Sequence, residues 1–321
     1  MPPAPAFRTL LLILGYVAGV LVCGALLAPP LFFAAQSVME ASPDGVVAQV
    51  VGDKEFPGYF NRAVLLAALM GLWPLLRALD MRWRDVVGDV PLGRGAWEAA
   101  LGFGTALLVI WLMGVFCLWQ EACRIKPDPA WGGVIKPLLS GVTVSVIEEF
   151  LFRGAVLGVL CRALGTWSGL WWTTVIFAFV HFLKPPLEGA IPHDSVTWLT
   201  GFQVITQLFR GFGAWENVVA EFLVLAAVGW VLARARLATN GLWLGIGLHA
   251  GLVAGMKYFS QIIFTTKALR AGEFTPWMTP NTCRAIVSPI VGLVPLVAVL
   301  LAGAIVLFIV TWTKRRDVQT C

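Results

Sequence analysis

Two adjacent carboxylates lie inside an apolar stretch of the sequence, in the segment VIEEFLFRG at residues 146–154. Arg153 follows Glu149 by four residues, so on a helix the two side chains would be neighbours, with the acid on the favourable N-terminal side. Glu148 lies about 100° around the helix from Glu149 and is left without an intrahelical partner. A lone carboxylate at membrane depth must be protonated or met by another polar group, which makes Glu148 a functional candidate.

Two histidines from other apolar segments are available to meet Glu148. His181 and His249 both fall in apolar stretches, whereas His193 lies in the polar segment IPHDS and is expected to be solvated. A desolvated carboxylate is a stronger base than a hydrated one, and imidazoles carry protons near neutral pH. Glu148, His181 and His249 therefore form a constellation suited to general base catalysis, in which a water molecule becomes the nucleophile.

Three other interpretations use the same side chains. The first is structural, with a buried Glu149–Arg153 pair beside a protonated Glu148. The second is a zinc-dependent membrane protease in which His181, His249 and a carboxylate hold the metal, although the chain has no H-E-x-x-H motif. The third is a non-catalytic membrane partner or transporter, in which Glu148 relays protons and the histidines bind a ligand.

The composition indicates which elements must position these residues. Of the 321 residues, 59% are hydrophobic and only 13% are charged, and the mean hydropathy is +0.82; soluble domains have roughly 25% charged residues. The sequence predicts an all-α fold, a polytopic membrane bundle of about eight transmembrane helices, as a single integral-membrane domain over 1–321 with the motif-bearing core at about 135–257. The predicted spans lie near 8–35, 63–79, 96–119, 135–163, 168–184, 218–235, 240–257 and 286–312.

The segments outside the predicted spans carry most of the charge. Residues 76–95 and the C-terminal TKRRD are rich in basic side chains, which favours a cytoplasmic location for both. In a membrane protein the net charge of +5 indicates topology and contact with anionic lipid, not nucleic-acid binding. Residues 185–217, with SVTWLTGFQVITQLFRGF, predict a re-entrant or interfacial amphipathic helix.

Glycines recur every four residues on the segment that carries His249. Gly247, Gly251 and Gly255 would form one face of a helix and allow a neighbouring helix to approach closely. His249 lies about 200° around that helix from Gly247. We therefore expect the glycine face to fix the helix in place while His249 points away from it, toward a cavity.

The six cysteines follow no metal-binding spacing such as C-x-x-C. Cys23, Cys117 and Cys161 fall within or beside apolar runs, where a buried thiol is usually inert. Cys123 and Cys283 fall in predicted loops on the same side of the membrane, so a disulfide between them is one alternative and two free thiols the other.

The order and spacing of three motifs resemble those of the CPBP family, the CAAX prenyl endopeptidases and bacteriocin-processing-type (Abi) proteins, which are glutamate-type intramembrane proteases. The motifs are E-E-x-x-x-R (Glu148, Glu149, Arg153), F-x-x-x-H (Phe177, His181) and a histidine on a later helix (His249). The resemblance covers about 135–257, and the segments before and after it match only in being membrane spans.

The resemblance implies a role for each of these residues. Glu148, Glu149, His181 and His249 would be the catalytic set, with Arg153 and Phe177 orienting it; no metal or other cofactor is implied. Glu148 would activate water for attack on a peptide carbonyl and His181 would position that water. His249 would face the developing oxyanion, Glu149 and Arg153 would orient the site, and Phe177 would form a wall one turn before His181.

The sequence departs from the family at one place. The family often has an asparagine four residues after the third-motif histidine, as a second oxyanion donor, and here that position is Val253. Loss of such a donor costs on the order of 10²–10³ in rate if nothing replaces it. Gln203, Gln207 and Asn240 are the substitutes that the sequence offers.

The resemblance also implies what the protein acts on. We expect cleavage near the C-terminus of a membrane-associated protein or peptide, with a lipidated substrate and one carrying a C-terminal sorting tag as alternatives. Membrane lipid is the other expected partner, and nucleic acid is not expected. The expected location is a bacterial inner (cell) membrane, as a multi-pass protein.

Overall fold

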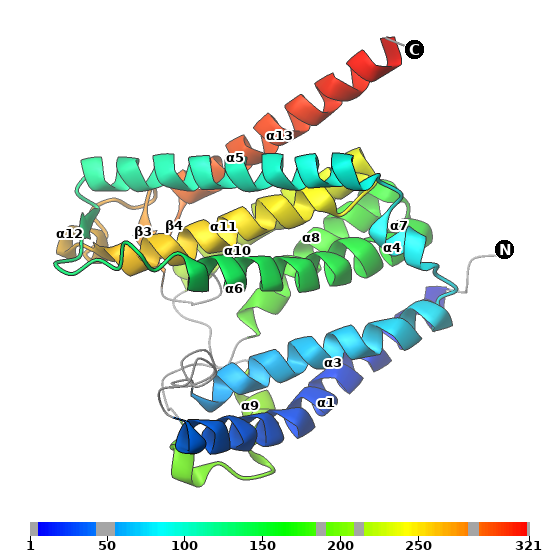
Figure 1. The fold of residues 1–321 in the computed structure, drawn as a ribbon, viewed down its shortest axis with the longest axis horizontal. Helices are drawn as coiled ribbons and strands as arrows, with labels where there is room; N and C mark the ends of the chain where they lie inside the picture. The colour runs from blue at the N-terminus through cyan, green and yellow to red at the C-terminus, as the bar shows by residue number, and fades with distance from the viewer. Residues whose placement is uncertain (1–5, 43–54, 184–190, 209–214, 282–288, 320–321) are drawn as a thin grey trace. The chain divides into compact units, whose positions relative to one another are not determined.

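The protein is almost entirely helical in the computed structural model, which describes residues 6–42, 55–183, 191–208, 215–281 and 289–319. Helices account for 79% of it, which confirms the all-α prediction (Figure 1). The chain forms two compact units: the first is Met1–Met81 with Phe182–Phe212, and the second is Arg82–His181 with Gly213–Cys321. The single domain over 1–321 stays a prediction. All six candidate site residues belong to the second unit.

The first unit is built on two long helices, α1 (Ala6–Ala41) and α3 (Phe56–Ala78), which pack against each other. Their shared core is aromatic, since the Phe32 ring meets the Phe56 and Tyr59 rings edge to face. The predicted re-entrant or interfacial segment contains a 3₁₀ turn, η2 (His193–Ser195), and one short helix, α9 (Thr200–Gln207), which packs on α1. Residues 184–190 and 209–214 of that segment lie outside the described residues.

The second unit is a bundle in which α11 runs between α5 and α6 (Figure 1). The α6 helix continues without a break through a π-helix, η1, into α7. The long elements are α5 (Leu92–Trp119), α6 (Ile135–Glu148), η1 (Glu149–Val156), α7 (Leu157–Leu164), α8 (Thr166–Phe182), α10 (Trp215–Thr239), α11 (Trp243–Ile262) and α13 (Leu293–Gln319). The short helices α4 (Trp83–Val87) and α12 (Lys267–Arg270) lie between them in sequence.

Two short antiparallel pairs of strands complete the second unit. Strand β1 (Cys123–Ile125) pairs with β2 (Ile263–Thr265), so the chain after α5 is joined to the chain after α11. Strand β3 (Thr279–Pro280) pairs with β4 (Ile290–Val291). Cys123 is buried in β1. It is a free thiol there, which agrees with the alternative of free thiols and not with a disulfide to Cys283, a residue that lies outside the described residues.

The glycine face of α11 packs on α5, as the sequence predicts. A β-carbon on Gly247 would lie 2.0 Å from the carbonyl oxygen of Ala99, and one on Gly251 would lie 2.6 Å from that of Phe103. Only a residue without a side chain allows the two backbones to come this close. With α5 on this side of α11, His249 points to the other side, toward α6 and η1.

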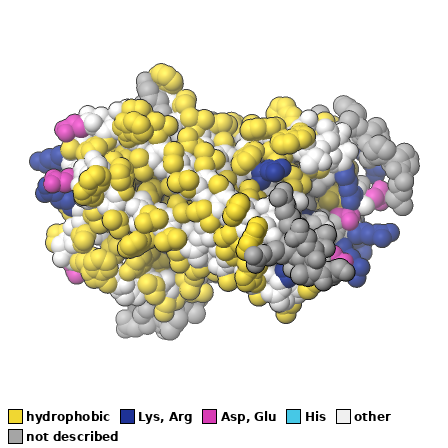
Figure 2. Space-filling model, turned by 90° about the horizontal axis from the view of Figure 1, so that it is seen from above, with side chains coloured by type: hydrophobic (Ala, Val, Ile, Leu, Met, Phe, Trp, Pro, Cys, Tyr) yellow, Lys and Arg dark blue, Asp and Glu magenta, His cyan; other side chains and the backbone are white. Residues whose placement is uncertain are grey.

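Within the described part of the chain, five helical segments are long and apolar enough to cross a membrane: Leu11–Ala41, Phe56–Ala78, Leu92–Trp119, Val218–Thr239 and Leu293–Thr313. In Figure 2 hydrophobic side chains cover the face that is drawn, and charged side chains gather toward its two ends. These features belong to a polytopic membrane bundle. The other three predicted spans, 135–163, 168–184 and 240–257, are largely helical but are not among the five, so the count of eight stays a prediction.

Candidate active site

The glutamate pair lies at a change of helix type. Glu148 ends α6, and Glu149 begins the π-helix η1, whereas the sequence analysis treats the whole motif as one regular helix. Four successive residues of η1, Phe152 to Ala155, are buried, so this part of the helix is enclosed on every side. A β-carbon on Gly154 would lie 2.4 Å from the Val86 side chain of α4, which packs directly on η1. Short π-helices within α-helices occur frequently at functional sites.

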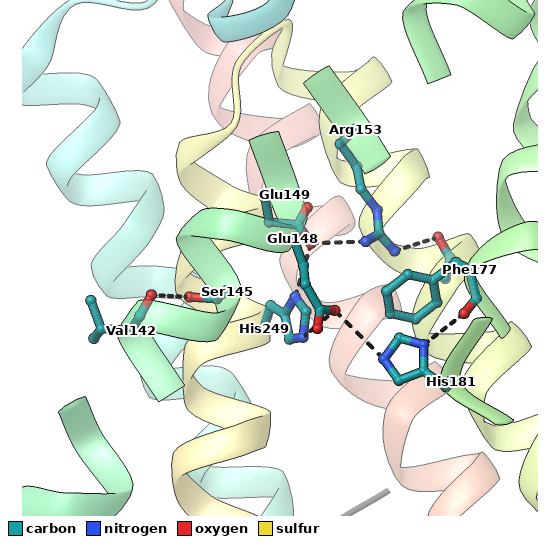
Figure 3. A network of polar contacts seen from close by, with 9 residues as sticks. Val142, Ser145, Glu148, Glu149, Arg153, Phe177, His181 and His249 are labelled. Atoms are coloured by element: carbon teal, nitrogen blue, oxygen red, sulfur yellow. Dashed lines mark hydrogen bonds and ion pairs between the residues drawn. The ribbon is translucent and has the colours of Figure 1, made fainter. Parts of the chain in front are cut away.

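The predicted ion pair of Glu149 and Arg153 forms, with Oε1 of the acid 3.0 Å from Nη1 of the base and both side chains fully buried (Figure 3). Arg153 also donates from Nη2 to the carbonyl oxygen of Gly229 on α10, at 3.3 Å. Its guanidinium carbon lies 4.2 Å from the centre of the Phe177 ring, within the range of a cation–π contact. The buried charge is therefore balanced by a carboxylate, a carbonyl oxygen and an aromatic face.

His249 contacts both glutamates. Its Nδ1 lies 2.9 Å from the same Oε1 of Glu149 that accepts from Arg153. Its Nε2 lies 3.8 Å from Oε2 of Glu148. A carboxylate paired with arginine accepts hydrogen bonds, so Nδ1 carries the proton and Nε2 is the nitrogen turned toward Glu148. The spacing of four residues in the sequence pairs Glu149 with Arg153 alone and does not indicate this second use of the carboxylate.

His181 approaches Glu148 from α8. Its Nδ1 lies 2.6 Å from the carbonyl oxygen of Phe177 one turn earlier, and because a carbonyl only accepts, Nδ1 donates. Its Nε2 is then directed at Oε2 of Glu148, at 3.5 Å (Figure 3). The Phe177 ring lies beside the imidazole, with 4.4 Å between ring centres, so Phe177 lies beside both His181 and Arg153.

The two glutamates have different environments. The Glu148 and His181 side chains are each 14% exposed, whereas the Glu149 side chain is fully buried. Both imidazole Nε2 atoms converge on one oxygen of Glu148 at distances longer than a direct strong hydrogen bond. Polar groups at such separations are commonly bridged by water. Glu148 is therefore the carboxylate that a water molecule or a substrate can reach.

Gly245 is a site residue that the sequence analysis does not single out. A β-carbon on Gly245 would lie 2.7 Å from Oε2 of Glu149, so α11 presents bare backbone to the buried carboxylate. Its position one turn before His249 is the sequence signal that could identify it. The carbonyl of Gly229, by contrast, is a backbone group, so no residue type in the sequence predicts its role as an acceptor.

The structure describes the position of the expected second oxyanion donor and the three residues that could replace it. Val253 is partly exposed on α11, one turn after His249. Asn240 follows α10, and its side-chain oxygen accepts from Arg236 at 3.3 Å. Gln203 and Gln207 belong to α9 in the first unit.

No group of three or more His, Cys, Asp or Glu side chains in the described part of the chain is arranged to hold a metal ion. The metal-free site and the zinc-dependent alternative both stay predictions.

Residues 130–254 match the family model described as Type II CAAX prenyl endopeptidase Rce1-like. The matched region runs from the loop before α6 into α11 and contains Glu148, Glu149, Arg153, Phe177, His181 and His249. No curated protein matches the chain. The family match confirms the resemblance seen in the motifs: the protein is a membrane-embedded peptidase, similar over these residues to the CAAX prenyl endopeptidases.

Proposed function

We propose that the protein cleaves a peptide bond near the C-terminus of a membrane-associated protein or peptide, with Glu148 as the base that activates water. The observation that carries this proposal is the convergence of two imidazole Nε2 atoms on one oxygen of Glu148, whose side chain is partly exposed. Because both Nδ1 atoms are held by acceptors, the two rings are fixed in orientation. A general base needs this kind of placement within reach of its water.

In the proposed reaction Glu148 removes a proton from water, and the resulting hydroxide forms a bond to the peptide carbonyl carbon. His181 orients the water through Nε2. His249 binds the developing oxyanion, for which its Nε2 must carry a proton; Glu149 beside Nδ1 stabilises the imidazolium, as the buried acid does in a catalytic triad. Glu148 then passes its proton to the departing amine, so one water is consumed and a carboxylate and an amine are released.

The Glu149–Arg153 pair supports this chemistry without taking part in bond changes. Arg153 neutralises the Glu149 charge and, through Gly229, ties the π-helix to α10. A fixed carboxylate is what keeps His249 from rotating away from Glu148. Arg153 and Phe177 are therefore proposed as positioning residues.

The test is a comparison of matched glutamate variants in purified full-length protein. We expect Glu148→Gln to lower kcat by about 10³-fold or more while helical content and thermal unfolding stay unchanged. Glu98→Gln is the control, because Glu98 is a fully buried glutamate of α5 that also pairs with an arginine four residues away. Cleavage by Glu148→Gln at the wild-type rate would refute the proposed base.

Two further measurements test the metal-dependent alternative and identify the substrate. Stoichiometric zinc in the purified protein, together with loss of activity on chelation, would favour the metal-dependent alternative. Proteomics of membrane fractions from cells with wild-type protein or Glu148→Gln would show which C-termini change. The candidate substrates are prenylated C-termini, exported peptides and sorting tags, and the proposed location is a bacterial inner membrane in contact with lipid.

A further inference from the structure

Three sulfur atoms from separate segments meet at the end of the second unit that carries α12 and β3 (Figure 1). Cys117 lies in the last turn of α5, Cys123 begins β1, and Met278 directly precedes β3. All three side chains are buried. The thiol of Cys117 donates to Sδ of Met278 at 3.6 Å, and the thiol of Cys123 is hydrogen-bonded to that of Cys117. We name these three residues the sulfur cluster.

The way in which α5 ends brings the two cysteines together. Glu121 lies in the left-handed region, with a φ of 55°, and its N–H donates to the carbonyl oxygen of Leu118 at 3.1 Å. The N–H of Ala122 reaches back to the carbonyl oxygen of Cys117 at 3.0 Å. These two hydrogen bonds form a Schellman motif, which ends a helix and turns the chain away from its axis. Cys123 therefore returns to the last turn of α5 and meets Cys117.

The third sulfur comes from a distant part of the chain. The N–H of Met278 donates to the carbonyl oxygen of Phe274 at 3.0 Å, and the next two residues form β3, which pairs with β4. Strand β1 is in turn paired with β2. Backbone hydrogen bonds thus fix each segment that contributes a sulfur. The spacing of the cysteines in the sequence does not reveal the cluster, because its third member is a methionine.

The separation of the sulfurs suits one metal ion. Bonds from a metal to thiolate sulfur are about 2.3 Å long, so two sulfurs on one metal at tetrahedral to trigonal angles lie roughly 3.8–4.0 Å apart. The 3.6 Å between Sγ of Cys117 and Sδ of Met278 is close to that separation. Only small shifts of the side chains are therefore needed to admit an ion.

The chemistry of these ligands favours Cu(I). Thiolate and thioether sulfurs are soft ligands and bind Cu(I) in preference to hard cations such as Mg²⁺ or Ca²⁺. Structural zinc sites take four ligands from Cys, His, Asp or Glu. In the described part of the chain, no third side chain of these types completes a metal-binding group with the two cysteines. A thioether in the third position is therefore a ligand set for Cu(I) and not for zinc.

We propose that Cys117, Cys123 and Met278 bind one Cu(I) ion. Cys117 contacts both other sulfurs, so it gives up its thiol proton to solvent and binds as the thiolate, while Cys123 binds as the thiol and Met278 as the thioether. The bound site then has no net charge, as its burial requires. Arg124 and Trp277, the residues next to Cys123 and Met278, are exposed, so the ion has only a short path from the surface.

The test measures Cu(I) binding by purified full-length protein in detergent, without oxygen and with ascorbate as reductant. The protein competes for Cu(I) with a chromophoric chelator. To leave only the thiols of the sulfur cluster, the other cysteines are replaced by alanine: Cys23, Cys161, Cys283 and Cys321. We expect this protein to retain one Cu(I) per chain, and its midpoint of thermal unfolding to rise with Cu(I), because a ligand that binds the folded state stabilises it.

In the same background, Cys117→Ala and Cys123→Ala should each abolish binding at the chelator concentration used. Met278→Leu nearly conserves volume and should fold normally. It should weaken Cu(I) binding at least about tenfold, since even groups that only support a metal ligand are worth about 10- to 100-fold in affinity. Met113→Leu is the matched control, because Met113 is a buried methionine one turn before Cys117 on α5, and it should bind Cu(I) as the parent does.

Circular dichroism of each variant shows that loss of binding is not loss of folding. No Cu(I) retained by the parent protein, or equal Cu(I) affinity in the parent and in Met278→Leu, would overturn the proposed site. Retention of Zn(II) in preference to Cu(I) would overturn the identity of the metal.

Discussion

Glu149 and His249 are joined by one hydrogen bond, 2.9 Å between Oε1 and Nδ1, which links the π-helix to α11 inside the second unit. The same oxygen is 3.0 Å from Arg153. The orientation of the imidazole thus depends on a carboxylate that is held from a second direction. Since the other imidazole nitrogen faces Glu148, a disturbance of Glu149 reaches the proposed catalytic carboxylate through His249.

Removal of the arginine should destabilise the fold strongly. Arg153→Met leaves Glu149 buried without its cation, and breaking a buried pair in this way costs about 3–5 kcal/mol. We expect that loss in the free energy of unfolding, measured by denaturation in detergent. The control is Arg124→Met, which breaks an exposed pair with Glu121 and should change stability by less than about 1 kcal/mol. Equal effects of the two variants would contradict the buried pair's structural role.

A methyl group at Gly245 should impair activity more than folding. The new β-carbon would lie 2.7 Å from Oε2 of Glu149, whose other oxygen is held by Arg153 and His249, so the carboxylate must shift. We expect Gly245→Ala to lower kcat at least about tenfold, since small misplacements in a site have effects of this size.

Gly104→Ala is the control for that substitution. Nothing lies within 4 Å of a β-carbon at Gly104 on α5, so alanine there should be neutral or stabilise the helix by up to about 1 kcal/mol. Steady-state kinetics and circular dichroism on both variants give the comparison. Full activity in Gly245→Ala would show that Glu149 is not constrained as described.

Stability should fall at acid pH through Asp85, which lies outside the predicted spans. The backbone N–H of Arg82 and then the Arg162 guanidinium hold the pKa of the Asp85 carboxyl below its ordinary value of 3.8. Because the pKa of Asp85 is lower in the folded state, its carboxylate stabilises the fold above about pH 4. This stabilisation is lost as the pH falls through the folded-state pKa. In thermal unfolding from about pH 5 to pH 2.5, Asp85→Asn should show a shallower decline than wild type. If the two proteins lost thermal stability in parallel, groups other than Asp85 would be responsible for the loss at acid pH.

An added amide at Val253 should accelerate the reaction. Val253 is partly exposed one turn after His249, at the position where the family often has asparagine. If the oxyanion there has one donor, Val253→Asn should raise kcat by about 10- to 100-fold, the order of effect of such a donor. Val253→Leu adds no donor and should give no increase. An unchanged rate in both variants would mean that the second donor is supplied elsewhere.

Local spacing was enough to predict the contacts that lie within one helix or on one helix face. The Glu149–Arg153 pair follows from a separation of four residues, and the packing of Gly247 and Gly251 on a neighbouring helix follows from their period. The family motifs select the set of side chains that meets at Glu148. The ion pair and the glycine face depend on helix geometry alone, which the sequence pattern encodes directly.

The remaining features depend on how separate helices meet. The hydrogen bond between His249 and Glu149 requires α11 to pass α6 in one direction and depth, and no local pattern specifies either. The acceptor for Arg153 at Gly229 is a backbone carbonyl on a third helix. The π-helix arises where four successive residues are enclosed by neighbours, which is a property of the packed bundle.

The π-helix also makes this motif intolerant of changes in chain length. Glu148 belongs to a helix of one pitch and Arg153 to a helix of another, so the angular phase between them is fixed by the number of residues in the wider turn. Insertion of one further residue between Arg153 and Leu157 would rotate everything beyond it by about 100° relative to Glu148. Substitutions in this stretch act one side chain at a time, whereas a single insertion would change the phase of the whole segment.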